Sequence, residues 1–296
     1  MITSYGFIAA LSLASLLACA GVYLHARKIP YGAIIRFCAL SVLLALIFSR
    51  LLFALTALGC RDVFSSPVQM LYFWDGGASI TGAFIGVVLA AWLISRWQKI
   101  SAATLMDGIA LGAPIAIIIE RLAEPAHELG LGRYVDTEAL QFLGSLTDGR
   151  HPVYLYECCI AALILLGLVW MLLRSKKRPG DLMLTFLTLY GCAQTLLESL
   201  RDDQHMVIYF IRVNQIAGII MAVIAFAMWT RRWRRQGAKK AHVVLACIIT
   251  ALAILQGIVQ EFAVDSNPNL LLEYGIMAAC LAVIAALSLT IRRKAV

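Results

Sequence analysis

The chain has 296 residues, of which 61% are hydrophobic and 14% are charged, and its mean hydropathy is +0.85. This composition excludes a soluble globular domain, because too few charged residues remain to cover a water-facing surface. The formal charge of +8 comes from basic residues beside apolar segments, which indicates contact with anionic lipid and excludes nucleic-acid binding.

Nine apolar segments follow one another along the chain, and most reach the roughly 20 residues that cross a bilayer as a helix. Backbone groups in lipid must be hydrogen-bonded within their own segment, and no alternating barrel pattern is present. The sequence therefore predicts an all-α polytopic transmembrane bundle with about nine spans. They are expected near residues 5–24, 33–58, 79–95, 103–119, 154–173, 182–200, 206–229, 241–260 and 271–291.

Basic residues are concentrated in every second connection between the expected spans, and most acidic residues lie in the other connections. The positive-inside rule therefore predicts an N-terminus outside the cell and a C-terminus in the cytoplasm. The first span has no basic residue before it, so we expect it to stay in the mature chain. The basic groups are Arg27, Lys28 and Arg36; Arg96 and Lys99; Arg174 and Lys176 to Arg178; Arg231 to Lys240; and Arg292 to Lys294.

Eight cysteines lie almost entirely within the apolar segments, and their spacing shows neither a C-x-x-C pattern nor a Cys/His ligand set. Cysteines in this setting are typical small packing residues. We expect no disulfide bond and no bound metal, and the sequence indicates no cofactor.

Residues 74–86, which open the third span, are rich in glycine and other small residues. Such residues let helix backbones pack closely, and they also let a lipid headgroup approach. Close packing is the simpler interpretation, but polar groups beside the glycines favour a headgroup-binding entrance as the alternative. The residues of that entrance would be Asp75, Gly76, Gly77, Thr81 and Gly82.

Ionisable residues are concentrated between the fourth and fifth spans, on the side expected to face outward. Arg121 and Glu124 follow the fourth span, and Glu157 lies about one turn inside the fifth. An unpaired charge costs several kcal/mol in hydrocarbon, so we expect a functional site. Glu157 and Tyr156 either tie the outer loop to an arginine or bind substrate. His151 is either a hydrogen-bonded anchor of that loop or a base.

The sixth span carries polar residues at steps of three and four, which place them on one helical face. Because lipid penalises such a stripe, we expect it to face the bundle interior, where Glu198 and Arg201 are able to pair. The stripe either joins helices or contributes to a site. Its members are Tyr190, Gln194, Glu198 and Arg201.

These stretches, taken in order, resemble the prolipoprotein diacylglyceryl transferase family, whose members move diacylglycerol from phosphatidylglycerol onto a lipoprotein cysteine. The resemblance covers roughly residues 1–230. It implies the same activity in a bacterial cell membrane, with phosphatidylglycerol, related phospholipids and a prolipoprotein as partners. The matching positions are Tyr5-Gly6, Ser49 to Leu52, Gly76-Gly77 to Gly86, Asp107, Glu120-Arg121, His151-Pro152, Leu155 to Glu157, Tyr190-Gly191, Glu198, Arg201 and Gln215.

The chain departs from the family pattern at three places. Thr81 stands where the family has histidine, and Gln194 stands where it has arginine. The segment Ala123-Glu124-Pro125 replaces Gly-Asn-Phe. These changes leave a second interpretation open, a non-catalytic phospholipid-binding or scaffold protein. A transporter is a third, although no inverted repeat supports it.

The implied transfer needs a cation for the phosphate and a base for the thiol. Arg121 is the expected phosphate ligand, because a guanidinium grips phosphate oxygens in pairs, and Arg50 and Arg201 are next. The base is His151, Glu124 or Glu198, or the arginines lower the pKa of the thiol itself. We assign catalysis to Arg121, His151, Tyr190, Glu198 and Arg201, and substrate binding to Tyr5, Arg50, Asp75, Gly76, Gly77, Thr81, Gly82, Glu124, Tyr156, Glu157 and Gln194.

Two parts of the chain are expected to be organised differently. Residues 1–230 should form a seven-helix membrane core with an outer-side loop region at 122–152. Residues 231–296 should form a basic linker followed by a two-helix membrane hairpin, because the resemblance ends there and the hairpin carries no polar stripe.

Overall fold

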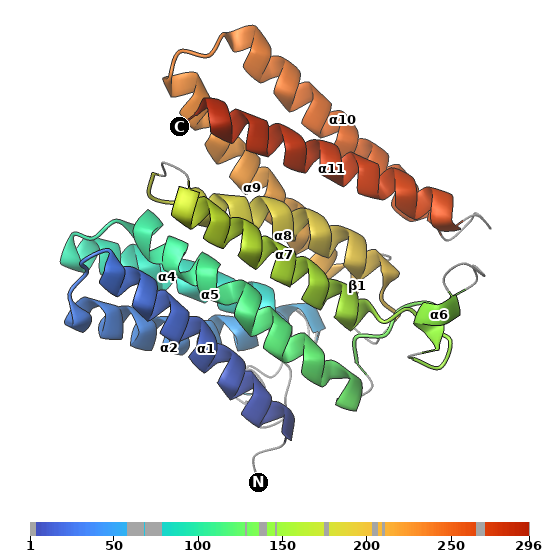
Figure 1. Cartoon of the computed structure of the whole chain (residues 1–296), viewed down its shortest axis with the longest axis horizontal. Coiled ribbons are helices and arrows are strands. Elements are labelled where there is room, and N and C mark those ends of the chain that lie inside the picture. The colour runs from blue at the N-terminus through green and yellow to red at the C-terminus, as the bar shows by residue number, and fades with distance from the viewer. Residues whose placement is uncertain are drawn as a thin grey trace.

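The computed structural model is a bundle of long helices that run side by side (Figure 1). It describes residues 4–57, 68, 79–127, 129–135, 141–145, 147–174, 178–202, 207–208, 211–264 and 270–295. Within these residues nine helices are at least 19 residues long, which confirms the predicted all-α bundle. They are α1 (Ser4–Ala26), α2 (Tyr31–Ala57), α4 (Ile80–Gln98), α5 (Ala102–Ala123), α7 (Val153–Arg174), α8 (Asp181–Leu200), α9 (Val213–Arg235), α10 (Lys240–Val264) and α11 (Leu270–Lys294).

Eight of these nine helices are long and apolar enough to cross a membrane, and α8 is the exception. The eight expose large apolar side chains, among them Val22, Trp97 and Leu173 at 73–78% exposure, which suits contact with lipid. α8 is instead buried along most of its length, and it packs against α5, α7, α9 and α11. Its polar residues therefore contact protein rather than lipid, as the sequence predicts for the sixth span.

Glycines bring three helix pairs into backbone contact. A Cβ on Gly82 or Gly86 of α4 would overlap backbone atoms of α2. The same is true of Gly112 in α5 against α1, and of Gly191 in α8 and Gly218 in α9 against each other. Close packing therefore accounts for Gly82, for which the sequence leaves packing and headgroup binding open.

Basic residues occur in the turns at one end of the bundle. The turns that join α1 to α2, α4 to α5 and α9 to α10 lie at the left of Figure 1, together with the end of α11. Those turns carry Arg27, Lys28, Lys99 and Lys239. α6 (Gln141–Gly144) and β1 (Val207–Ile208) lie at the opposite end. We therefore expect the basic end to face the cytoplasm and the α6 end to face outward.

The seventh span begins later than the sequence predicts. β1 pairs antiparallel with β2 (Ile211–Arg212), and α9 begins only at Val213. The prediction of a helix from residue 206 is therefore wrong for this stretch. The reason is that Val207, Ile208 and Ile211 are β-branched residues, which favour strands, and a short apolar run has no period that separates strand from helix.

The last two helices are attached to the rest of the bundle. α10 packs along α11, and α11 also packs against α8 and α9. The Tyr274 hydroxyl donates a hydrogen bond to the Ser199 carbonyl at 3.0 Å, and Gln215 donates through Nε2 to Oε2 of Glu261 at 2.7 Å. These contacts place the C-terminal pair on the α8 and α9 side of the bundle, away from α1 and α2 (Figure 1).

Candidate active site

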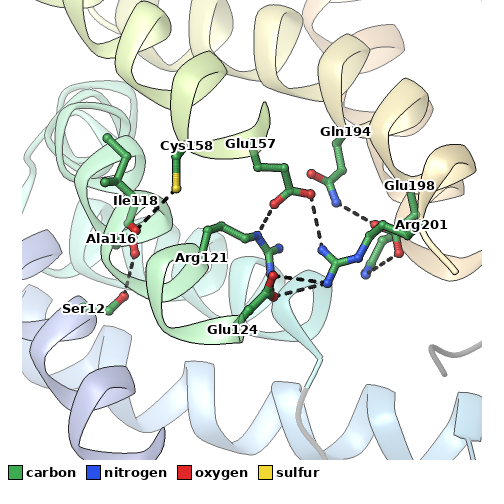
Figure 2. Close-up of polar contacts among 11 residues, drawn as sticks. Ser12, Ala116, Ile118, Arg121, Glu124, Glu157, Cys158, Gln194, Glu198 and Arg201 are labelled. Carbon is green, nitrogen blue, oxygen red and sulfur yellow. Dashed lines mark hydrogen bonds and ion pairs between the residues drawn. The ribbon is translucent and has the colours of Figure 1, made fainter. Parts of the chain in front are cut away.

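Four charged side chains from distant parts of the chain meet where α5, α7 and α8 have their α6-side ends (Figure 2). They are Arg121 in the last turn of α5, Glu124 in the 3-10 helix η3 (Glu124–His127), Glu157 in the first turns of α7, and Arg201 directly after α8. The sequence predicts ionisable groups at this end, and the fold brings these four into direct contact. We call them the ion-pair ring.

Each carboxylate of the ion-pair ring contacts both guanidiniums. Arg121 pairs through Nη1 with Glu124 and through Nε with Glu157. Arg201 donates from Nη2 to both oxygens of Glu124 at 3.3 Å, and from Nη1 to Oε1 of Glu157 at 3.4 Å. Positive and negative charges therefore alternate around a closed circuit.

The ion-pair ring is withdrawn from solvent. Arg121 is 7% exposed, Arg201 and Glu124 are each 2% exposed, and Glu157 is 1% exposed. Burying one ion costs several kcal/mol even after relaxation, and only good geometry and complete pairing offset that cost. Apolar residues of similar volume often stabilise a protein as well as such a ring does. A functional role is therefore the better explanation for placing it here.

A third carboxylate lies beside the ion-pair ring. Glu198 of α8 is fully buried, and it accepts hydrogen bonds from Nε2 of Gln194 at 2.9 Å and from Nδ2 of Asn214 at 3.2 Å. Figure 2 shows Gln194 and Glu198 next to Arg201. Both of these donors are neutral amides, so they satisfy the oxygens of Glu198 without adding positive charge.

Tyr190 extends the polar face of α8 toward α5. The Tyr190 hydroxyl lies within electrostatic range of the Arg121 guanidinium, and the Tyr190 ring stacks on Phe186 with a centroid distance of 5.2 Å. Tyr190 itself is 7% exposed. The polar stripe predicted for the sixth span thus faces the interior, and Arg201 belongs both to the stripe and to the ion-pair ring.

The loop that follows η3 closes over the end of α8 through main-chain contacts. Gly132 forms an antiparallel bridge with Arg201, and the Arg133 amide donates to the Leu200 carbonyl at 3.0 Å. The Gly132 amide donates to the His151 carbonyl at 2.8 Å. A Cβ on Gly132 would lie 2.8 Å from the Leu200 carbonyl oxygen, so the approach depends on glycine.

His151 lies on the outer loop, and residues 132 and 133 lie between it and the end of α8. Its Nδ1 is within hydrogen-bond distance of the Tyr156 hydroxyl at 3.1 Å, and its amide donates to the Arg133 carbonyl at 2.9 Å. Gly132 separates the Cβ of His151 from the Leu200 carbonyl. Of the two interpretations of His151, these contacts support an anchor of the outer loop.

Other residues predicted to bind substrate lie on the α2 and α4 pair. Arg50 of α2 is 6% exposed, and its guanidinium carbon lies 5.4 Å from the centre of the Phe53 ring. Thr81 lies in the first turn of α4, which Ser79 caps by accepting a hydrogen bond from the Gly82 amide at 3.3 Å. The side chain of Tyr5 and all of Asp75, Gly76 and Gly77 lie outside the described residues.

Sequence reasoning missed two residues of this region. Asn214, in the first turn of α9, donates to Glu198, and Arg212 donates from Nη2 to the Arg201 carbonyl at 2.6 Å. The available signal was the adjacent pair Asn214 and Gln215 at the start of an apolar helix, because lipid disfavours two neighbouring amides.

The cluster suits an oxygen-bearing anion better than a metal ion. Across the part of the chain that the structure describes, no group of three or more His, Cys, Asp or Glu side chains is placed to hold a metal. Arg121 and Arg201 instead direct their guanidiniums at the same two carboxylates. Guanidiniums bind carboxylate and phosphate oxygens with the same bidentate geometry.

Comparison with known proteins gives the family. The model of the prolipoprotein diacylglyceryl transferase family matches residues 1–231. The phosphatidylglycerol–prolipoprotein diacylglyceryl transferase of Chromohalobacter salexigens is 32% identical over 182 residues, which are 59% of this chain and 68% of that protein. The enzymes of that name from Brucella anthropi and Brucella ovis are 30% and 29% identical over 186 and 180 residues, which are 66% and 64% of those proteins.

These matches span about two thirds of the length of the relatives, and the family match ends inside α9. α10 and α11 therefore lie beyond it. The matched region contains the whole ion-pair ring together with Tyr190 and Glu198. The chain belongs to the prolipoprotein diacylglyceryl transferase family.

Proposed function

We propose that this protein transfers a diacylglyceryl group from phosphatidylglycerol to the cysteine thiol of a prolipoprotein at the bacterial cell membrane. Relatives that carry this name support the proposal. The observation that carries it is the meeting of Arg121 and Arg201 on shared carboxylates at one end of the bundle. Two converging guanidiniums are what a departing glycerol phosphate requires.

The reaction forms a carbon–sulfur bond and breaks a carbon–oxygen bond. The cysteine thiolate attacks the glycerol carbon that bears the phosphate ester, the electron pair of the carbon–oxygen bond passes to the oxygen, and glycerol phosphate leaves. The thiol gives its proton to a base. Negative charge grows on the phosphate in the transition state, so the main demand on the protein is positive charge placed there in advance.

The polar residues of the cluster divide between these tasks. Arg121 and Arg201 hold the phosphate, and the Tyr190 hydroxyl, within electrostatic range of Arg121, helps to position its guanidinium. Glu198 is assigned as the base, because neutral amides hold it while guanidiniums neutralise Glu124 and Glu157. Glu198→Gln should therefore stop transfer and leave phosphatidylglycerol binding in place.

The other residues support or surround this centre. Gln194 orients Glu198, and Tyr156 holds His151 in the outer loop. The lipid headgroup is proposed to reach the arginines from the α2 and α4 side. There the Ser79 amide, which follows the glycine pair in sequence, donates a hydrogen bond to the Ser49 hydroxyl at 2.9 Å. The residues assigned to this approach are Tyr5, Arg50, Asp75, Gly76, Gly77 and Thr81.

Direct transfer tests the proposal. Purified protein is incubated with labelled phosphatidylglycerol and a peptide that contains a lipobox cysteine. The expected result is the mass of one diacylglyceryl group added to the peptide, with release of glycerol phosphate, and no addition to a peptide with serine in place of the cysteine. Bound lipid without transfer would overturn the proposal and leave a phospholipid-binding scaffold as the better account.

A further inference from the structure

The position between the two arginines is already filled by a carboxylate of the chain itself. Arg201 donates from Nη2 to both oxygens of Glu124, and Arg121 pairs with the same carboxylate through Nη1. A group held in this way by two guanidiniums has the contacts that a phosphate group would adopt in its place. Glu124 therefore occupies the site that the proposed function assigns to the lipid phosphate.

A phosphate cannot simply be added to this cluster. Arg121 and Arg201 bring two positive charges, whereas three carboxylates lie among them at 2% exposure or less. Those carboxylates are Glu124, Glu157 and Glu198. A further negative charge would enter a region that water does not screen, where the repulsion is large. Binding therefore requires one carboxylate to leave the guanidiniums.

Glu124 is the carboxylate that is placed to leave. It stands on η3, outside α5, and the next residues, Pro125 and Ala126, are exposed. Glu157 and Glu198 lie within α7 and α8, where helix packing surrounds them. For Glu124 to leave the guanidiniums, its side chain would rotate, or η3 would move, toward the exposed Pro125 and Ala126.

The outer loop is shaped around the Glu124 carboxylate. Gly130 has a φ of +76°, and a Cβ at this position would fall on Oε2 of Glu124 and within 2.8 Å of the Cβ of Tyr154. A positive φ also favours glycine. The loop backbone therefore lies directly against the carboxylate, with no side chain between the two.

We infer that Glu124 is a built-in competitor of the lipid phosphate, which holds the two guanidiniums in the resting protein and must be displaced before a phosphate-bearing headgroup binds. The inference rests on the proposed function, because it concerns the same site. The apparent Kd for phosphatidylglycerol is then the intrinsic Kd divided by the fraction of protein in which Glu124 has left the arginines.

Substitution of Glu124 in the full-length protein tests the inference. The wild type, Glu124→Gln and Glu124→Asp are titrated in detergent with short-chain phosphatidylglycerol, and binding is followed by calorimetry. Glutamine keeps the size of the side chain and removes its charge. The expected result is a Kd at least about tenfold lower for Glu124→Gln, and a smaller decrease for Glu124→Asp, whose shorter side chain cannot span both guanidiniums equally well.

A control variant separates this effect from a general change of charge. Glu261→Gln removes a carboxylate of α10 that accepts a hydrogen bond from Gln215, and it should leave the Kd unchanged. A folded Glu124→Gln variant with an unchanged or higher Kd would overturn the inference and make Glu124 a structural counter-ion. If Glu124→Gln does not fold, Glu124→Asp decides, and an unchanged Kd overturns the inference.

The same preparations distinguish failure of this inference from failure of the proposed function. Transfer to the lipobox peptide by the wild type, together with an unchanged Kd in the Glu124 variants, would remove the inference alone. Tighter lipid binding by Glu124→Gln without transfer by any variant would remove the proposed function and keep the competitor role of Glu124.

Discussion

Gln194 donates a hydrogen bond to Glu198 from one turn earlier in α8, at 2.9 Å. Both side chains are at most 5% exposed. A neutral amide satisfies the Glu198 carboxylate but adds no positive charge, so the cluster keeps more carboxylates than guanidiniums. Residue 194 therefore sets the charge balance of the candidate active site, and the family pattern has arginine there.

Gln194→Arg should strengthen transfer. A third guanidinium at position 194 adds a ligand for the departing phosphate, and a gain of about 1.4 kcal/mol in the transition state corresponds to about tenfold in rate. The double variant with Thr81→His, which restores a second family residue, should be faster still. Initial rates of peptide modification measure this. A stable double variant with an unchanged or lower rate would count against the transferase function.

Arg121→Lys should lower kcat more than it weakens lipid binding. Lysine keeps the charge but cannot contact Glu124 and Glu157 from two separate nitrogens, and that geometry matters most where charge develops. Arg121→Ala should damage both properties and cost about 3–5 kcal/mol of stability, because it leaves buried carboxylates unpaired. The control is Arg150→Lys, whose side chain is 32% exposed. Equal losses of kcat and affinity in Arg121→Lys would contradict the phosphate role.

Gly86→Ala should destabilise the bundle without touching the chemistry directly. Its Cβ would overlap the backbone of α2, so the helices must separate, which costs about 1–3 kcal/mol. Gly167 of α7 is the matched control, because a Cβ there meets nothing within 4 Å, and Gly167→Ala should leave the melting temperature equal or higher. Thermal unfolding in detergent compares the two variants. Identical melting temperatures would refute the packing role.

A chain that stops after Lys240 should fold and bind phosphatidylglycerol with an unchanged Kd, because α10 and α11 contribute no residue to the ion-pair ring. It should melt at a lower temperature, since it loses the hydrogen bond of Tyr274 to the Ser199 carbonyl, worth about 1 kcal/mol, and the packing of α11 on α8. Tyr274→Phe isolates the hydrogen bond. Loss of lipid binding in a folded, shortened chain would show that the C-terminal pair completes the site.

The orientation predicted from the basic residues is tested by cysteine labelling. Ser145 and Lys239 are exposed and lie at opposite ends of the bundle. In intact cells a membrane-impermeant maleimide should label Ser145→Cys and leave Lys239→Cys unlabelled until the cells are opened, measured against the unsubstituted chain. Labelling of Lys239→Cys alone in intact cells would reverse the assignment of the outer side.

Long helices and the inward polar face of α8 are predictable from the sequence, because the bilayer forces apolar segments to be helical and drives polar residues inward. The carboxylates that pair with Arg121 and Arg201 are not predictable in this way. Arg201 contacts Glu157 and Glu124, which are 44 and 77 residues away in the chain. The sequence indicates that Glu124 and Glu157, if buried, each need a positively charged partner. Which arginine becomes that partner depends on how the helices pack in the whole fold.

The remaining differences between the sequence-based predictions and the structure arise in short segments that fit two interpretations. Val207 and Ile208 pair as a strand with Ile211 and Arg212 because β-branched residues suit strands, yet this run joins the apolar sequence pattern of the seventh span without a break. The glycine-rich segment has two physical interpretations, and the contacts of Gly82 and Gly86 with α2 identify packing as the role of these two. Asn214 was missed because one amide at a helix start resembles an ordinary end residue.

The pairing of α1 with α5 has a consequence for biosynthesis. Ser12 donates a hydrogen bond to the Ala116 carbonyl, 104 residues away in the chain, and Gly112 packs on Leu16. At translation rates of about 5–20 residues per second, the first helix waits roughly 5–20 s in the membrane before its partner emerges. During that interval its interface must be shielded by lipid or by the insertion machinery, while α2 and α4, which pack on each other, are already complete.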